Sequence, residues 1–496
     1  MGNDNEVRFI DTTFRDGNQS LWALAMSTSM MLPVASRFEE AEFVAVELTS
    51  PAHFKTIVRE LREDPWERIR LISREMPTTP LAVMQHCSIV GFRIVPMSLA
   101  QLWMQRLAAN GIRRVHLMEA SNDFALRVPD YVKFATEAGM QVTLALTYSL
   151  SPKHTDEYYA EKARDAVALK VPAILLKDPG GLLTPERIRT LVPAILRNVG
   201  ETPVAFHSHC TTGLAPLCYL EAVRQGIRVL HTAIPPLANA SSQPSVLSVA
   251  NNLRYLDYVP RINEAPILAV ADHLHYIAKR EGRAIGAPVE YDEYQYIHQI
   301  PGGVISNLKR QLSQLRLIDK LPEVIMECVQ VRKDFGYPIM VTPFSQFVAA
   351  QAAINVVLGE RYKQVTDDLI FYALGFWGKE AAATIDCNVM DRIMSLQRSK
   401  ELADWKSPDL SLEQVRVQYG GDGLSDDDLL LRYMVGSDDD INAMRAAGPI
   451  RCDEYAGAET PLRILLKELL KRRDLSHVSI RVRDLDIALD RVGRSV

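Results

Sequence analysis

The first half of the chain alternates short apolar runs with longer stretches of helical periodicity. The runs return at intervals of about 30 residues, the size of one strand–helix unit. They are nearly continuous in apolar character, as expected of parallel strands that are covered on both faces. Eight such units favour an α/β fold closed into a (β/α)8 barrel, the TIM barrel. The expected strands are residues 7–13, 43–50, 80–86, 113–120, 141–148, 172–179, 203–209 and 229–236.

An open, doubly wound sheet is the alternative arrangement of the same elements. Its dinucleotide-binding form carries a GxGxxG motif directly after the first strand. No such motif follows residues 7–13 in this chain. The sequence therefore favours the closed barrel.

Beyond about residue 255 the pattern becomes mostly helical. Residues 267–282 are amphipathic and end at Gly282, and residues 345–359 also have helical periodicity. Two SDDD segments are typical of helix starts, because serine caps the first turn and aspartate favours the helix dipole. We expect three regions, namely a barrel domain at 1–295, a helical region at 296–390 and a charged helical region at 391–496.

Composition and charge exclude several classes of protein. A net charge of −5 over 496 residues gives no sign of nucleic-acid binding. No uninterrupted apolar run reaches the length of about 20 residues that a membrane helix needs. The N-terminal segment lacks the apolar core of a signal peptide, and the six cysteines form no CxxC pair. We therefore expect a cytoplasmic protein.

Polar residues stand at the ends of three predicted strands. His207 and His209 are two positions apart on one strand, so both side chains face the same side. Asp16 follows the first strand, and Lys177 ends the sixth. The carboxyl ends of barrel strands meet at one mouth. Two imidazoles and a carboxylate suit a divalent ion such as Zn²⁺, Mn²⁺ or Co²⁺, so we expect a metal site there.

Lys177 is an unusual member of this group, because an ammonium cannot bind a cation. It could be a surface lysine, an ion-pair partner of Asp178, or a lysine carbamylated by CO2, which turns it into an anion. The residues alone favour the ion pair with Asp178.

A series of segments in the same order resembles the carboxyltransferase family of biotin-dependent enzymes. This family includes the carboxyltransferase domain of pyruvate carboxylase, the oxaloacetate decarboxylase alpha subunit and the transcarboxylase central subunit. The resemblance covers about residues 8–380. The matching segments are DTTFRDGNQSLWA (11–23), EDPWERIR (63–70), YSLSPKHTDEYY (148–159), LLKDPGGLLTP (175–185), HSHCTTGLA (207–215), SSQPS (241–245), IPGGVISNL (300–308), RKDFGYPIMVTPFSQ (332–346) and LGERYK (358–363).

The resemblance implies a barrel followed by a mostly helical funnel, which would be residues 296–390. It also implies roles for single residues. Arg15 and Gln19 correspond to residues that contact the substrate or its enolate oxygen, and Ser241 corresponds to a threonine that relays a proton between biotin and substrate. The implied metal ligands are Asp16, a carbamylated Lys177, His207 and His209.

The third strand departs from the family pattern. Gln85 stands where the family has an arginine that binds the substrate carboxylate. Glutamine cannot match the charged, bidentate grip of arginine. We therefore expect Gln85 to line a changed substrate pocket, for an acid other than plain pyruvate. Alternatively, His86 or Arg93 replaces the lost arginine, and the substrate is unchanged.

The chain contains no Ala-Met-Lys-Met biotinylation motif and no ATP-grasp region. We expect biotin to arrive on a separate carrier protein, together with a possible biotin carboxylase subunit, and the chain to form a homodimer. One alternative function is a metal-dependent lyase or Claisen-type condensing enzyme of the same barrel superfamily, which shares the Arg15-Asp16-Gly17 sequence and the histidine pair. Another alternative is a non-catalytic scaffold subunit.

Overall fold

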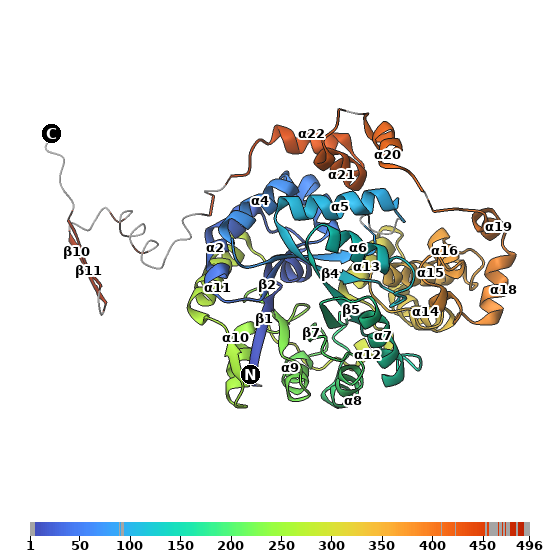
Figure 1. The fold of residues 1–496 in the computed structure, drawn as a ribbon, viewed down its shortest axis with the longest axis horizontal. Helices are drawn as coiled ribbons and strands as arrows, with labels where there is room; N and C mark the ends of the chain where they lie inside the picture. Colours follow the sequence, from blue (N-terminus) through green and yellow to red (C-terminus); the bar gives the residue numbers. More distant parts are fainter. Residues whose placement is uncertain are drawn as a thin grey trace.

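Eight parallel strands close into a barrel at the centre of the molecule (Figure 1). The computed structural model describes residues 5–451, except 89, 91–93, 408 and 422, and after these residues 454–455, 465, 469, 472, 477–482 and 485–490. Strand β1 pairs with both β2 and β8, which closes the barrel, and β9 adds to β1 outside it. Each predicted run overlaps one barrel strand, so the predicted barrel is confirmed. The strands are β1 (Glu6–Asp11), β2 (Ala45–Thr49), β3 (Leu81–His86), β4 (Ile112–Met118), β5 (Gln141–Thr147), β6 (Ala173–Asp178), β7 (Val204–Ser208), β8 (Val229–Thr232) and β9 (Val259–Arg261).

A ring of helices covers the outside of the barrel. Their starts follow local capping rules, as where Thr155 accepts a hydrogen bond from the backbone of Tyr158 at the start of α7. The predicted end of α11 at Gly282 is confirmed by a left-handed glycine with φ of 63°. The helices are α1 (Asn18–Trp22), α2 (Thr28–Glu40), α3 (Pro51–Thr56), η2 (Ile57–Leu61), α4 (Pro65–Glu75), α5 (Met97–Asn110), α6 (Val128–Glu137), α7 (Asp156–Ala168), α8 (Pro185–Leu196), α9 (Ala215–Arg224), α10 (Val246–Arg254) and α11 (Glu264–Glu281).

A second group of helices stands on the carboxyl end of the barrel, and its apolar core is continuous with buried residues of the barrel strands such as Met84 and Leu175. Arg332 Nη2 donates to Ser149 Oγ at 2.9 Å, in the loop that follows β5. Tyr296 OH donates to Thr212 Oγ1 at 3.3 Å, in the loop that follows β7. This is the helical region expected after the barrel. Its helices are α12 (Glu293–His298), α13 (Gly302–Gln314), η3 (Ile318–Lys320), α14 (Leu321–Asp334), α15 (Phe344–Leu358), α16 (Asp367–Ala373), α17 (Lys379–Ala382), α18 (Cys387–Ser395) and α19 (Gln397–Ala403).

The chain then returns to the barrel through α20 (Leu412–Tyr419), α21 (Asp426–Val435) and α22 (Asp438–Ala446), which lie over α4 and α5 (Figure 1). Asp427 pairs with Arg106 at 2.8 Å, and its carbonyl accepts a hydrogen bond from Trp66 Nε1 at 3.2 Å. Ser425 and Ser437 cap α21 and α22, as the SDDD segments predict. The buried residues of α20, α21 and α22 therefore pack in the core of the barrel. Those of α18 and α19 pack in the core of the helical region that follows the barrel.

The expectation of a wholly helical end is wrong for residues 477–482 and 485–490. Strands β10 (His477–Val482) and β11 (Leu485–Asp490) pair antiparallel there. The physical reason is visible in HVSIRV and LDIALD, where apolar residues occupy alternate positions, the period of a strand. No helix in the described parts of the chain is long and apolar enough to cross a membrane.

The packing of α21 on the barrel predicts that both unfold together. Leu430 is 0% exposed within the barrel core, so we expect Leu430→Ala to lower the free energy of unfolding. The expected loss is about 2–5 kcal/mol, seen as a single shifted transition in urea. Val417 on α20 is 70% exposed, so Val417→Ala is the matched control. A separate early transition, with the main one unmoved, would show that these helices fold independently.

Candidate metal centre at the barrel mouth

The turn after β1 brings two charged residues into the barrel mouth. Residues Thr13–Gly17 form a π-helical turn, η1, in which the Asp16 amide donates to Thr12 O at 2.8 Å. Gly17 permits this close approach, because a Cβ there would lie 2.8 Å from Leu237 O. Arg15 and Asp16 are each only 4% exposed. Their charges are therefore held away from bulk water.

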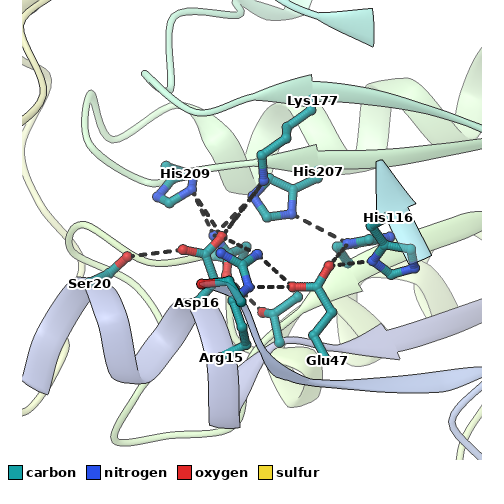
Figure 2. Close-up of polar contacts among 12 residues, drawn as sticks. Arg15, Asp16, Ser20, Glu47, His116, Lys177, His207 and His209 are labelled. Atoms are coloured by element: carbon teal, nitrogen blue, oxygen red, sulfur yellow. Dashed lines mark hydrogen bonds and ion pairs between the residues drawn. The ribbon is translucent and has the colours of Figure 1, made fainter. Parts of the chain in front are cut away.

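The four predicted metal ligands meet at this point (Figure 2). Asp16 Oδ2 lies 3.2 Å from His207 Nε2 and 3.4 Å from His209 Nε2. Lys177 pairs in register with His207 across β6 and β7, and its Nζ lies 3.0 Å from His207 Nε2 and 3.8 Å from Asp16 Oδ2. The ion pair with Asp178 is not formed. The Asp178 carboxylate instead accepts from Ser208 Oγ and from the amides of residues 182 and 183.

The hydrogen bonds assign the tautomers of both histidines. His209 Nδ1 lies 2.6 Å from the carbonyl of Ser241, which only accepts, so Nδ1 carries a proton. The Gln243 amide nitrogen, which only donates, lies 3.1 Å from His209 Nε2, so the lone pair of His209 is on Nε2. His207 Nε2 accepts from Lys177 Nζ, so its lone pair is also on Nε2. Two imidazole lone pairs therefore converge on the Asp16 carboxylate. This donor set fits a divalent cation.

Burial and charge fix the protonation of these groups. Burial favours a raised pKa for Asp16, but the Arg15 guanidinium outweighs it and holds that pKa well below its ordinary value. Burial, and then Lys177, lower the pKa of His207 to about 3, so its imidazole is neutral. Burial also lowers the pKa of Lys177 to about 8 in spite of the nearby Asp16. A neutral amine is therefore accessible to Lys177 near physiological pH.

Gln243 also belongs to the centre, although no role was predicted for it from the sequence. Its Nε2 lies 3.1 Å from His209 Nε2, 3.2 Å from His207 Nε2 and 3.3 Å from Asp16 Oδ2. Its Oε1 accepts from Thr12 Oγ1 at 2.7 Å, which fixes the orientation of the amide. The signal was its place in SSQPS, one of the segments that carry the resemblance.

A second polar group, also missed from the sequence, lies deeper in the barrel. Glu47 accepts from Arg15 Nε at 2.8 Å and from Arg15 Nη2, and its other oxygen accepts from His116 Nδ1. His231 Nδ1 is 3.6 Å from that same oxygen. All three residues are fully buried. The available signal was a polar residue inside each of three apolar strand runs.

Ser241 and Gln19 lie at the rim of the centre, and both side chains are exposed. Ser241 Oγ donates to the carbonyl of Ser20 at 2.9 Å, and Ser20 Oγ donates to Asp16 Oδ1 at 3.3 Å. Through its own carbonyl, Ser241 also holds His209. Ser241 is thus tied to the centre, whereas Gln19 stands on the exposed side of α1.

Gln85 is not brought into this group, contrary to its expected place in a substrate pocket. Its Oε1 accepts from Trp103 Nε1 at 2.7 Å, and its Nε2 donates to Ser88 O at 3.0 Å. Alternation along β3 is the reason, because neighbouring side chains point to opposite faces. His86 therefore faces inward, and burial, followed by Lys177 and Arg15, lowers its pKa to about 4. Arg93 lies outside the described residues.

Comparisons with known proteins show the family and the fold of the chain. Residues 6–273 match a family described as HMGL-like, and residues 296–435 match one described as a conserved carboxylase domain. The carboxyl transferase domain of pyruvate carboxylase from Rhizobium etli has the same fold, with a TM-score of 0.81 at 24% identity over 92% of this chain and 81% of that chain.

Two curated relatives cover most of the chain. A pyruvate carboxylase subunit from Methanocaldococcus jannaschii is 35% identical over 78% of this chain and 68% of its own length. The 2-oxoglutarate carboxylase large subunit from Hydrogenobacter thermophilus is 30% identical over 86% of this chain and 66% of its own length. The chain thus spans about two thirds of each relative.

The contacts of Gln85 predict a structural role that a double-mutant cycle can measure. Trp103→Phe leaves Gln85 Oε1 buried without its donor, so we expect it to lower the free energy of unfolding by about 1–3 kcal/mol. In a Gln85→Leu background the same substitution removes no hydrogen bond, so its cost should fall clearly. Equal costs in both backgrounds, measured by urea unfolding, would show that the two side chains are not coupled.

Proposed function

Since the chain belongs to the carboxyltransferase family of biotin-dependent enzymes, we propose that it moves a carboxyl group between carboxybiotin and a small acid. The observation that carries this proposal is the meeting of Asp16, Lys177, His207 and His209 at the barrel mouth. Those groups come from three different strand ends. A lyase or a scaffold has no comparable support from the named relatives.

Asp16, His207 and His209 would hold a divalent metal ion, with Lys177 as the fourth ligand. An ion bound there would act as a Lewis acid on a substrate oxygen. The structural support is the donor set, the Nε2 atoms of two histidines beside one ionised carboxylate. The backbone carbonyl of Ser241 orients His209, as partners of metal-binding histidines commonly do.

Lys177 would serve as a ligand only after carbamylation by CO2. In that reaction the neutral amine attacks the carbon of CO2, forms an N–C bond and releases one proton. Lys177 is suited to it because burial favours the neutral amine, and because Nζ already lies beside His207 and Asp16. The carbamate would lie next to the same two groups.

Arg15 and Ser241 would perform the remaining chemistry. Arg15 is buried beside Asp16 and adds positive charge where an enolate oxygen develops negative charge. In the carboxylating direction, the acid loses a proton from its reacting carbon and biotin gains one on nitrogen as CO2 leaves. The exposed Ser241 hydroxyl would relay that proton. We assign Gln19, also at the rim, a substrate contact.

The acid is proposed to differ from plain pyruvate in how its carboxylate is held. Gln85 accepts a hydrogen bond from Trp103 and points away from the barrel interior. The side chain that points inward at this end of β3 is therefore that of His86. The named relatives act on different acids, since one is a pyruvate carboxylase subunit and the other a 2-oxoglutarate carboxylase subunit. A change of acid within this family therefore has a precedent. Turnover of oxaloacetate by the wild type at the rate usual for the family would contradict the proposed change of acid.

We propose that the chain works as one subunit of a larger enzyme. Both named relatives are subunits by name. A biotinylated carrier protein would deliver carboxybiotin, and a biotin carboxylase subunit would load it. In this enzyme the chain would form a homodimer and act in the cytoplasm.

Substitution at Ser241 tests the proposed function. We expect the metal-loaded wild type to decarboxylate at least one oxo acid of a panel faster when free biotin is added. Ser241→Ala should lower the biotin-stimulated kcat by about a hundredfold or more, because the relaying hydroxyl is lost. Ser241→Thr keeps the hydroxyl and is the matched control.

Two results would count against the proposal. Equal activity of the alanine variant would remove Ser241 from the mechanism. A metal-loaded wild type that biotin does not stimulate on any acid of a panel would favour the lyase, and a wild type without metal or turnover would favour the scaffold.

Carbamylation of Lys177 should depend on pH in the metal-free protein. The pKa of Lys177 lies at about 8, below the ordinary lysine value, so the reactive neutral amine increases as pH rises through that value. At a fixed pressure of carbon-13 labelled CO2, the carbamate NMR signal should therefore grow between about pH 7 and pH 9. The signal should be missing in Lys177→Met. A signal that survives this substitution would assign the carbamate to another amine.

A further inference from the structure

We propose that Glu47, His116 and His231 form a positioning network beneath the metal centre, which holds His207 and Arg15 in their working orientations. The inference rests on the proposed function only in taking His207 as a metal ligand. The three side chains come from β2, β4 and β8 and are fully buried inside the barrel. Figure 2 shows Glu47 and His116 on the side of Arg15 and His207 that faces away from His209.

The first link of the network is between two imidazoles. His207 Nδ1 lies 3.4 Å from His231 Nδ1, and the rings are nearly perpendicular at 72°. Because the lone pair of His207 is on Nε2, its proton is on Nδ1 and is donated to His231. His231 therefore accepts on Nδ1 and carries its own proton on Nε2. This link keeps His207 Nε2 free to bind a metal ion.

The second link holds the arginine. Glu47 uses one oxygen for Arg15 Nε and Nη2 and the other for His116 Nδ1, so His116 is protonated on Nδ1. His231 Nδ1 is 3.6 Å from the second oxygen, which is too far for a good hydrogen bond. Glu47 thus fixes the guanidinium of Arg15 from below, and His116 fixes Glu47.

A second metal ion is disfavoured at these three residues, although their ligand atoms all lie within 4.8 Å of one another. Arg15 already neutralises the Glu47 carboxylate through direct contact. A divalent cation would sit beside that guanidinium in the closed interior without a second anion to balance it, which is costly. The network therefore positions other groups rather than binding an ion.

The network also carries a stability cost that points to function. No described group hydrogen-bonds to Nε2 of His231 or to Nε2 of His116, although both atoms are buried. An unpartnered buried N–H such as that of His231 destabilises the fold. An apolar residue of similar size would avoid this cost. We therefore assign His231 the role of hydrogen-bond acceptor, through Nδ1, for His207.

Two substitutions at His231 separate positioning from simple packing. His231→Leu removes the acceptor, whereas His231→Asn keeps an oxygen near the place of Nδ1. The readout is the dissociation constant of Zn²⁺ for the full-length protein, measured by competition with a chelator. We expect His231→Leu to weaken binding by about 10- to 100-fold and His231→Asn by no more than about threefold. The unfolding midpoint of the metal-free leucine variant should be unchanged or higher.

His273 provides the matched control, because it is a buried histidine on α11 whose Nε2 bonds to the carbonyl of Met30 at 2.9 Å. His273→Leu should leave zinc affinity unchanged. Equal zinc affinities of the leucine and asparagine variants at 231 would overturn the proposal. So would two zinc ions per wild-type chain, one of which is lost in His231→Leu. If the wild type binds one zinc ion yet transfers no carboxyl group, the proposed function fails, while the zinc affinities still decide the role of His231.

Discussion

The buried carboxylate of Asp16 is the constraint on which the centre depends. An ionised carboxylate removed from water must be matched by nearby donors or cations. Here Arg15 lies 2.9 Å from it and Lys177 at 3.8 Å, and Gln243 Nε2 donates to it at 3.3 Å. The π-helical turn and the space left by Gly17 make this placement possible. The neighbouring strand ends then supply the remaining groups from fixed positions.

Opposite charges alternate from the mouth into the barrel. Asp16 contacts Arg15, Arg15 contacts Glu47, and Glu47 contacts His116. Each charged group thus has a partner of opposite sign or a hydrogen-bond donor. The same alternation explains why these residues could stay polar inside strands that are otherwise apolar. The surrounding apolar residues limit access of water and strengthen each contact.

Periodicity was sufficient to predict the barrel, because strands covered on both faces leave a nearly continuous apolar run. The histidine spacing predicted that His207 and His209 share a face, and strand ends predicted the meeting with Asp16 and Lys177. Glu47, His116 and His231 were not predictable, because a single polar residue in an apolar run does not reveal its partners on distant strands. Gln85 was misplaced because alignment to a family position does not establish which face of β3 a side chain takes.

Charge balance gives a physical reason for a lysine at the metal centre. With Lys177 protonated, the buried cations Arg15 and Lys177 match the buried anions Asp16 and Glu47. A divalent ion alone would add two positive charges to a closed, weakly screened space, at high cost. Carbamylation changes Lys177 from a cation to an anion, which makes the group more negative by two charges. A divalent ion adds two positive charges, so the two changes cancel. The proposed carbamate and a divalent metal would therefore arrive without altering the net charge of the buried group, which a fixed aspartate or glutamate at 177 could not achieve in both states.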